Sequence, residues 1–292
     1  MRKIQRVIKS TQAHEGAGFV VNRPFPVAGL CGIDPFLLID ELGPIQYGPG
    51  EAKGAPDHPH RGFETISYIL EGGVFHEDSD GSSTELLKGD MQWMTAGRGV
   101  VHSELPLPSL MKNGGLFHAV QIWVNLPKKK KMIEPNYQNI RAEQIPILEP
   151  SEGITIKLLS GKISTAEGPV KNQTPILYAH LILSPGRTWS TSEIPKGWTT
   201  LAYVLSGKGT VSNSDLLGRT DLVQLEESSG EIRFRNSSKT EKFAILLLSG
   251  EPLKEPIERM GPFVMNTKRE LEQAYDDYLA GRMGAIQGQR QR

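Results

Sequence analysis

The chain of 292 residues is long enough for one large domain or two modest ones, and at 38% hydrophobic it can bury a core. Its 33 Lys and Arg balance its 33 Asp and Glu. A zero net charge argues against a protein that coats nucleic acid, which needs excess positive charge. The single cysteine, Cys31, excludes an intrachain disulfide and suits a reducing compartment. No stretch predicts a secretory signal or a membrane span, so we expect a cytoplasmic protein, with the nucleus open if the source is eukaryotic.

Short apolar or alternating runs recur along the chain between glycines and prolines. In order they are FVVNRPF, DPFLLIDEL, TISYILEGG, DMQWMTAG, HAVQIWVNLP, TIKLLSG, PILYAHLIL, TLAYVLSGKG, DLVQLE, EIRFRN and FAILLLSGEP. Many short strands with this punctuation predict an all-β sandwich or barrel. Helical periodicity is clear in NTKRELEQAYDDYLAG (266–281), which Asn266 or Thr267 can cap and Gly281 can end.

An internal repeat organises the chain. RGFETISYILEG (61–72) aligns with KGWTTLAYVLSG (196–207) at a constant offset, with both glycines, the tyrosine and the second threonine identical. The repeat predicts two tandem β-domains: residues 1–130, a linker over 131–150, and residues 151–292 including the terminal helix.

The second copy of the repeat keeps the strand pattern and loses a polar cluster. Glu193 and Pro195 stand where the first copy has His58 and His60, and a threonine replaces Glu64. If this cluster were needed for folding, both copies would be expected to carry it. The asymmetry therefore favours a functional role for the cluster in the first domain.

Two pairs of candidate metal ligands have strand spacing. His58 and His60 alternate in DHPHRGFE, and His102 and Glu104 alternate in GRGVVHSE, so each pair shares one face of its strand. Neighbouring strands lie about 5 Å apart, so both pairs can meet over one ion. Three imidazoles and a carboxylate leave two open positions on an octahedral ion. The set favours Fe(II), with Mn, Ni, Cu or Zn as competitors and a closed zinc site as the structural alternative.

The remaining polar candidates are less determined by spacing. Glu64 can ligate in place of Glu104, or it can orient an imidazole from outside the ligand set. His118 and Gln121 fall on opposite faces of one strand, so at most one faces the pocket. His76 lies in a polar turn and is interpreted as a surface residue.

At these residues the sequence resembles the pirin family. The segments HPHRGFETISYILEGG, GDMQWMTAGRGVVHSE, QIWVNLP, IPKGWTTLAYVLSG, GEPLKEPI and GPFVMNT look like pirin in order along nearly the whole chain. The resemblance implies a bicupin of two jelly-roll barrels, the first carrying a metal and the second metal-free. It implies that His58, His60, His102 and Glu104 hold Fe(II), with Glu64 in a supporting role.

The resemblance implies a quercetin 2,3-dioxygenase type of reaction, in which a flavonol or a related enol or catechol reacts with O2. Glu104 or Glu64 is then the candidate base for the substrate hydroxyl. Four apolar residues are candidates for the pocket, with barrel core the favoured interpretation for most of them: Phe63, Met91, Trp93 and Met94.

The alternative function is a non-enzymatic, iron-dependent regulator that binds a transcription factor or a metabolic enzyme, as other pirins do. The basic run KKKK (128–131) is a candidate nuclear address or acidic-partner patch, and a solvated linker run is the favoured interpretation. We expect no direct contact with nucleic acid or membrane, and a monomer.

Overall fold

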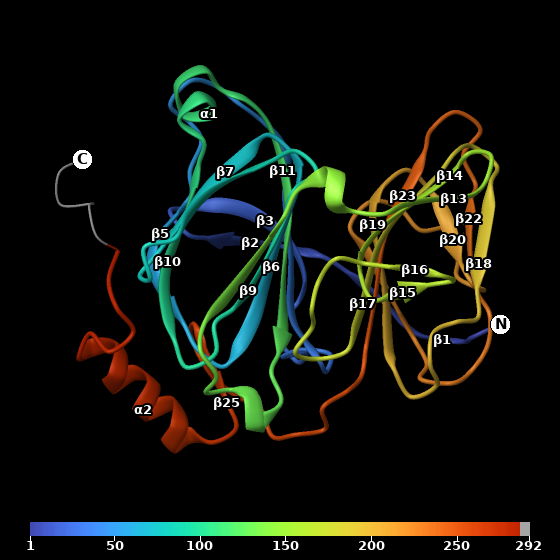
Figure 1. The fold of residues 1–292 in the computed structure, drawn as a ribbon. Helices are drawn as coiled ribbons and strands as arrows, with labels where there is room; N and C mark the ends of the chain where they lie inside the picture. Colours follow the sequence, from blue (N-terminus) through green and yellow to red (C-terminus); the bar gives the residue numbers. More distant parts are fainter. Residues whose placement is uncertain (287–292) are drawn as a thin grey trace. The chain divides into compact units, whose positions relative to one another are not determined.

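The computed structural model describes residues 1–286 and contains two compact units, each built around β-sheets. The N-terminal barrel comprises Gln12–Arg23, Phe36–Ala142 and the described residues from Leu253 on. The C-terminal barrel comprises Met1–Thr11, Pro24–Pro35 and Glu143–Pro252. The all-β prediction is confirmed (Figure 1).

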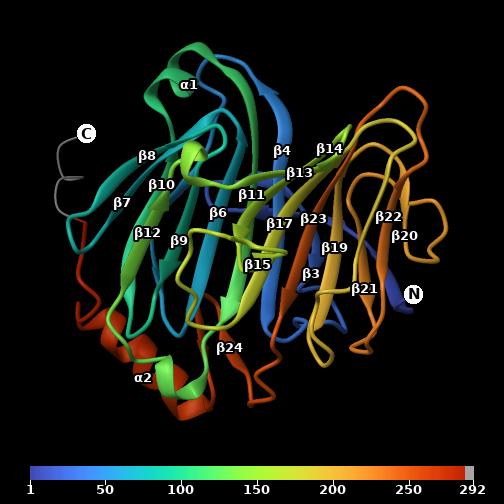
Figure 2. The ribbon, with the colours of Figure 1, turned by 45° about the vertical axis from the view of Figure 1, so that its right-hand side comes forward.

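The N-terminal barrel has two main sheets. The seven-stranded sheet runs in the order β12 (Asn136–Ile140), β9 (Met91–Thr95), β6 (Phe63–Glu71), β11 (Gly115–Asn125), β4 (Phe36–Tyr47), β3 (Phe19–Phe25) and β2 (Thr11–Glu15), part of which is visible edge to edge in Figure 2. The four-stranded sheet runs in the order β5 (Ala55–His60), β10 (Val100–Pro106), β7 (Gly73–Asp78) and β8 (Ser83–Leu87). This barrel also contains α1 (Pro108–Asn113), η1 (Lys128–Lys130), α2 (Lys268–Leu279) and the pair β24 (Glu258–Met260) and β25 (Phe263–Met265).

The C-terminal barrel repeats this plan. Its seven-stranded sheet runs in the order β1 (Ile4–Lys9), β21 (Asp221–Leu225), β19 (Thr199–Ser206), β23 (Phe243–Gly250), β17 (Ile176–Leu183), β14 (Ile154–Ser160) and β13 (Ile147–Ser151). A second sheet contains β18 (Thr188–Thr191), β22 (Ile232–Asn236) and β20 (Gly209–Val211); β15 (Lys162–Ile163) pairs with β16 (Ala166–Glu167), and η2 covers Ala142–Gln144. One cluster of buried aliphatic and phenylalanine side chains fills the barrel.

The internal repeat corresponds to strands at the same place in the two sheets. β6 is third in the first sheet and β19 is third in the second. The glycines at their ends have matching backbone angles: φ is 89° at Gly62 and 87° at Gly197, and 75° at Gly72 and 76° at Gly207. These left-handed values favour glycine over any residue with a Cβ. The repeat therefore preserves both the strand and the turns that end it.

The two units are interleaved along the chain, which differs from the predicted continuous segments. β1, from the N-terminus, pairs with β21 of the C-terminal barrel. β12, inside the predicted linker, pairs with β9 of the N-terminal barrel. Each of these strands is the outermost strand of its sheet and pairs with a strand far away in the sequence. Local sequence pattern does not specify such a long-range pairing.

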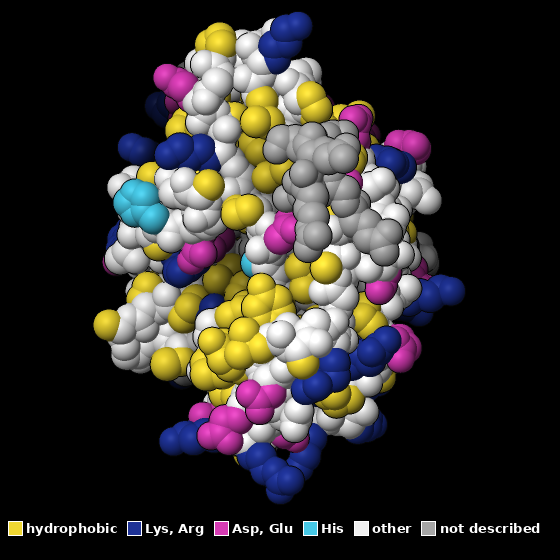
Figure 3. Space-filling view, turned by 90° about the vertical axis from the view of Figure 1, so that its left-hand side faces the viewer, with side chains coloured by type: hydrophobic (Ala, Val, Ile, Leu, Met, Phe, Trp, Pro, Cys, Tyr) yellow, Lys and Arg dark blue, Asp and Glu magenta, His cyan; other side chains and the backbone are white. Residues whose placement is uncertain are grey.

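The terminal helix forms where the sequence predicts it. The Thr267 hydroxyl accepts a hydrogen bond from the Glu270 N–H, and Gly281 has a φ of 72° just past the end. The helix buries Leu271 and Ala274 against Val101 and Phe263 of the N-terminal barrel, not against the C-terminal barrel to which it was assigned. Figure 3 views this side of the barrel, where hydrophobic side chains gather near the middle and charged ones toward the lower edge.

The basic run 128–131 is not a uniformly solvated segment. Lys128–Lys130 form the turn η1, whereas Lys131 is 1% exposed. The Lys131 ammonium donates hydrogen bonds to the Gly62 carbonyl at 2.8 Å, the Asn125 amide oxygen at 2.7 Å and the Val264 carbonyl at 3.0 Å. The interpretation as a solvated run is therefore wrong for Lys131, which connects three segments of the barrel. Within residues 1–286, no helix is long and apolar enough to cross a membrane.

Candidate metal centre

Three histidines converge at the pairing of β5 with β10. His102 lies directly opposite His58, and His60 follows two residues along β5 on the same face. The ring centroids lie 4.3 Å apart for His58 and His102 and 4.8 Å apart for each pair that includes His60. One potential donor atom from each histidine lies within 4.8 Å of the others. Among residues 1–286 this is the one such cluster of three or more histidine, cysteine or acidic side chains.

Hydrogen bonds at Nδ1 orient all three imidazole rings. His58 Nδ1 lies 2.7 Å from the Pro56 carbonyl oxygen, and His60 Nδ1 lies 3.3 Å from that of Pro262. His102 Nδ1 lies 2.7 Å from Nε2 of His76. Nε2 of His102 is buried and has no hydrogen-bond partner, which is costly unless an ion accepts its lone pair. This donor set fits a transition-metal ion.

Burial also favours the uncharged form of two of these imidazole rings. Desolvation, followed by the charge of neighbouring imidazoles, holds the pKa of His60 and of His102 well below the usual histidine range. Both rings are therefore neutral at pH 7, which is the form that binds metal.

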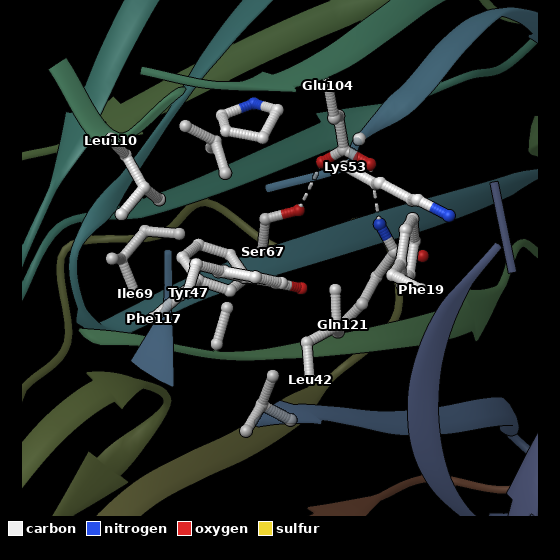
Figure 4. A pocket seen from close by; sticks show the side chains of 15 residues that line it. Phe19, Leu42, Tyr47, Lys53, Ser67, Ile69, Glu104, Leu110, Phe117 and Gln121 are labelled. Atoms are coloured by element: carbon white, nitrogen blue, oxygen red, sulfur yellow. Dashed lines mark hydrogen bonds between the residues drawn. The ribbon is translucent and has the colours of Figure 1, made fainter. Parts of the chain in front are cut away.

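Glu104 lies beside the histidines with its carboxylate held at both oxygens. The Ser67 hydroxyl donates to one oxygen at 2.7 Å, and the Gln121 amide donates to the other at 2.7 Å (Figure 4). Glu104 lines a cavity together with His58 and His60, but it is not among the residues whose potential metal-binding atoms converge. Gln121 lines the same cavity, whereas His118 bonds to the Glu41 carboxylate at 2.8 Å, as expected if the two side chains leave opposite faces of β11.

The sequence left Glu64 open as a ligand, as a residue that orients an imidazole or as the base; in the structure it does not belong to the histidine cluster. It lies three residues before Ser67 on β6, so its side chain leaves the face opposite to the one that reaches Glu104. One of its oxygens accepts a hydrogen bond from the Thr95 hydroxyl at 2.7 Å. Complete burial raises the pKa of Glu64 to about 7.

His76 was interpreted as a surface residue, and this is wrong. It lies on β7, is 1% exposed and contacts His102. The sequence HEDSDG reads as a polar turn, but β7 continues through Asp78 and the turn comes after it. The signal that could have found it is alternation, since His76 and Asp78 share one face of their strand.

A cavity of about 520 Å³ opens over His58 and His60. His58, His60 and Glu104 line it together with Trp123, and Arg259 lies with its guanidinium carbon 4.7 Å from the centre of the Trp123 ring. Arg259, Gly261 and Pro262 come from the segment around β24, which no local pattern connects to the site. Met91, Trp93 and Met94 are fully buried and do not line the cavity, as the core interpretation holds, whereas Phe63 packs on His60.

Glu104 also lines a second, largely apolar chamber of about 40 Å³. Ile69, Leu110 and Phe117 line it, and Tyr47 and Phe117 contact each other with ring centroids 6.5 Å apart (Figure 4). Four residues line both spaces, so the two adjoin each other: Phe19, Leu42, Glu104 and Gln121.

Comparison with known proteins agrees with this arrangement. The family model for pirin matches residues 18–124, and the model for the pirin C-terminal cupin domain matches residues 178–284. Human pirin is 39% identical over 97% of this chain and 94% of the human protein. Pirin-like protein 2 of Arabidopsis thaliana is 37% identical over 96% of this chain and 85% of its own length.

A solved structure gives the same relationship in three dimensions. The crystal structure of quercetin 2,3-dioxygenase from Acinetobacter baumannii superposes with a TM-score of 0.92 at 36% identity, covering 98% of this chain and 99% of that protein. The two matched family models, the two barrels and the sequence identity to named pirins give the same assignment. The chain belongs to the pirin family of the cupin fold.

Proposed function

We propose that this protein is a mononuclear Fe(II)-dependent dioxygenase of quercetin 2,3-dioxygenase type, acting with O2 on a flavonol or a related enol or catechol. The observation that carries the proposal is the cluster of His58, His60 and His102, of which His58 and His60 line a cavity of about 520 Å³. Such a cavity is large enough for a small aromatic molecule. The similarity to the Acinetobacter enzyme supports the reaction class.

Glu104 is the proposed fourth donor. Each carboxylate oxygen has more than one acceptor site, so hydrogen bonds from Ser67 and Gln121 do not prevent it from binding an ion as well. Three imidazoles and one carboxylate suit Fe(II), with Mn, Ni, Cu or Zn as alternatives. An ion bound at these donors would act as a Lewis acid and as a redox centre for chemistry with O2.

The residues of the cavity have distinct proposed roles. Glu104 accepts the proton of the substrate hydroxyl, and the hydrogen bonds from Ser67 and Gln121 fix the direction of its carboxylate. Trp123 lines the cavity, and its indole N–H donates to the Gln121 amide oxygen at 3.3 Å, which helps to hold the amide that binds Glu104. Leu38 and Leu42 make part of the cavity wall apolar and so disfavour water.

The test is oxygen consumption by the Fe(II)-loaded protein. The protein is loaded anaerobically with Fe(II), mixed with quercetin and O2, and followed by oxygen uptake and loss of flavonol absorbance. We expect both signals in wild type, their loss with the metal in His60→Ala, and their retention in the control His14→Ala, whose histidine is exposed.

The two remaining outcomes separate the hypotheses. Wild type that holds stoichiometric iron and consumes no O2 with quercetin refutes the proposal for that substrate and favours the iron-dependent regulator. A His60→Ala variant with full metal content refutes the ligand assignment. In Glu104→Gln, which keeps the size of the side chain, we expect turnover to fall by about 10²–10⁴ if Glu104 is the base.

A further inference from the structure

His76 stands out among the buried polar residues because it contacts the cluster without belonging to it. Its Nε2 lies 2.7 Å from Nδ1 of His102, and the two ring centroids lie 4.9 Å apart. Nε2 of His76 therefore faces the Nδ1 side of the His102 ring, and His76 is not one of the three residues whose potential metal-binding atoms converge.

The partner of His102 differs in kind from those of the other two histidines. Pro56 and Pro262 offer carbonyl oxygens, which can only accept, so Nδ1 of His58 and of His60 must carry the proton. Each ring then has a free lone pair at Nε2. An imidazole, in contrast, can either donate or accept, so the tautomer of His102 depends on that of His76.

The surroundings of His102 select one of the two directions. Nε2 of His102 is buried without a partner; if it carried the proton, an N–H would be buried with nothing to accept it. With the proton on Nδ1, His102 donates to His76, and its Nε2 presents a lone pair toward the other two rings. The same hydrogen bond fixes the rotation of the His102 ring.

The structure holds His76 where this role requires. β7 pairs with β10, with His76 opposite Glu104 and Asp78 opposite His102. The His76 ring packs on the Tyr137 ring with centroids 5.4 Å apart. His76 is 1% exposed, so little water competes for the hydrogen bond.

We propose that His76 is a positioning residue of the metal centre: its Nε2 accepts the Nδ1 proton of His102 and so sets the tautomer and ring orientation in which His102 can bind the ion. The inference rests on the proposed metal site, and it gives a side chain outside the ligand set a defined part in that site.

The first test uses the metal-free wild-type protein. Long-range ¹H–¹⁵N correlation spectra of the imidazoles distinguish the two neutral tautomers. We expect His102 and His76 both to be protonated at Nδ1, with the His102 proton slow to exchange. A His102 protonated at Nε2 overturns the inference, whether or not the protein proves to be a dioxygenase.

The second test compares two variants by Co(II) titration. His76→Gln can place a carbonyl oxygen near the position of Nε2, whereas His76→Phe keeps a ring and removes the acceptor. We expect affinity for Co(II) about 10–100-fold weaker in His76→Phe and close to wild type in His76→Gln. In proton NMR of the Co(II)-loaded protein, the shifted ring N–H signal of His102 should persist in His76→Gln and be lost to exchange in His76→Phe.

The outcomes distinguish the inference from the proposed site. A wild type that binds no Co(II) refutes the metal site itself. A wild type and His76→Phe that bind Co(II) equally, with the same ring N–H signals, refute only the role of His76. If His76→Phe fails to fold, the test rests on folded His76→Gln alone. A His76→Gln variant that loses both its affinity for Co(II) and the ring N–H signal of His102 refutes the proposal that an acceptor at this position holds the Nδ1 proton of His102.

Discussion

Replacing Lys131 by methionine tests whether its ammonium holds the N-terminal barrel together. Lys131→Met keeps an unbranched apolar stem and removes a donor with three buried acceptors. In the variant these three oxygens lose a buried donor, and an unsatisfied buried acceptor costs about 1–3 kcal/mol, so the loss is roughly 3–9 kcal/mol. Burial lowers the pKa of Lys131 from 10.5 to about 8, so the variant also avoids a cost of roughly 3 kcal/mol for the charged form. We therefore expect a net loss of up to roughly 6 kcal/mol at pH 7, a large part of typical domain stability.

The pH dependence provides a second, independent signature. Between pH 8 and 10.5 the unfolded chain keeps the Lys131 proton while the folded protein loses it, so the free energy of unfolding rises with pH. Lys131→Met lacks this rise, and its deficit relative to wild type should widen by up to roughly 3 kcal/mol. The assay is urea denaturation of metal-free protein at pH 7, 8.5 and 10, with the exposed Lys129→Met as control. Equal stability of Lys131→Met and wild type at pH 7, or a constant difference across this range, would refute the reasoning.

Three further predictions follow from other parts of the N-terminal barrel and the repeat. A Cβ at Gly62 would meet the Val264 carbonyl oxygen at 2.0 Å, while one at Gly197 meets nothing within 4 Å, although φ is nearly equal. In urea denaturation, Gly197→Ala should cost about 1–2 kcal/mol and Gly62→Ala clearly more; equal losses would contradict the clash. Burial raises the pKa of Asp277, but hydrogen bonds from Arg61 and two neighbours outweigh it and lower the pKa to about 2. The stability that this ion pair contributes is present above pH 4 and is lost as pH falls toward 2. In Asp277→Asn the free energy of unfolding should therefore decrease less over this pH range than in wild type, and an unchanged decrease would count against the role of the pair. Affinity for Co(II) should fall at acidic pH as protons compete for the imidazoles, and because burial lowers the pKa of His60 well below 6.5, its contribution should appear only well below that pH; affinity that does not fall anywhere in the acid range over which the protein stays folded would count against imidazole ligation.

Much of the local geometry of the site could be predicted from alternation within strands. Because side chains two residues apart share a face, His58 with His60 and His102 with Glu104 had to point together in pairs. The repeat of 61–72 at 196–207 showed that the strand and its glycine turns form without these residues, and the equal φ angles at Gly62 and Gly197 agree. The terminal helix followed from its cap and its stop for the same reason: the interactions are local.

Other parts of the site depend on strands that are distant in sequence. Glu104 receives its hydrogen bonds from β6 and β11, and His60 receives its acceptor from Pro262. No local pattern marks Ser67 or Gln121 as partners of one carboxylate, because their positions are set by the pairing of whole sheets.

The sequence by itself determined the all-β class, the duplication, and the two histidine-bearing strand segments, since these follow from short-range periodicity. Only the tertiary structure decided which neighbours surround those side chains. It buried His76 behind His102, turned Glu64 to the opposite face, brought Arg259 over Trp123 and enclosed Lys131. The physical reason is that burial and hydrogen bonding here arise from β-pairing between segments far apart in the chain, whose register is fixed by packing of the complete barrel.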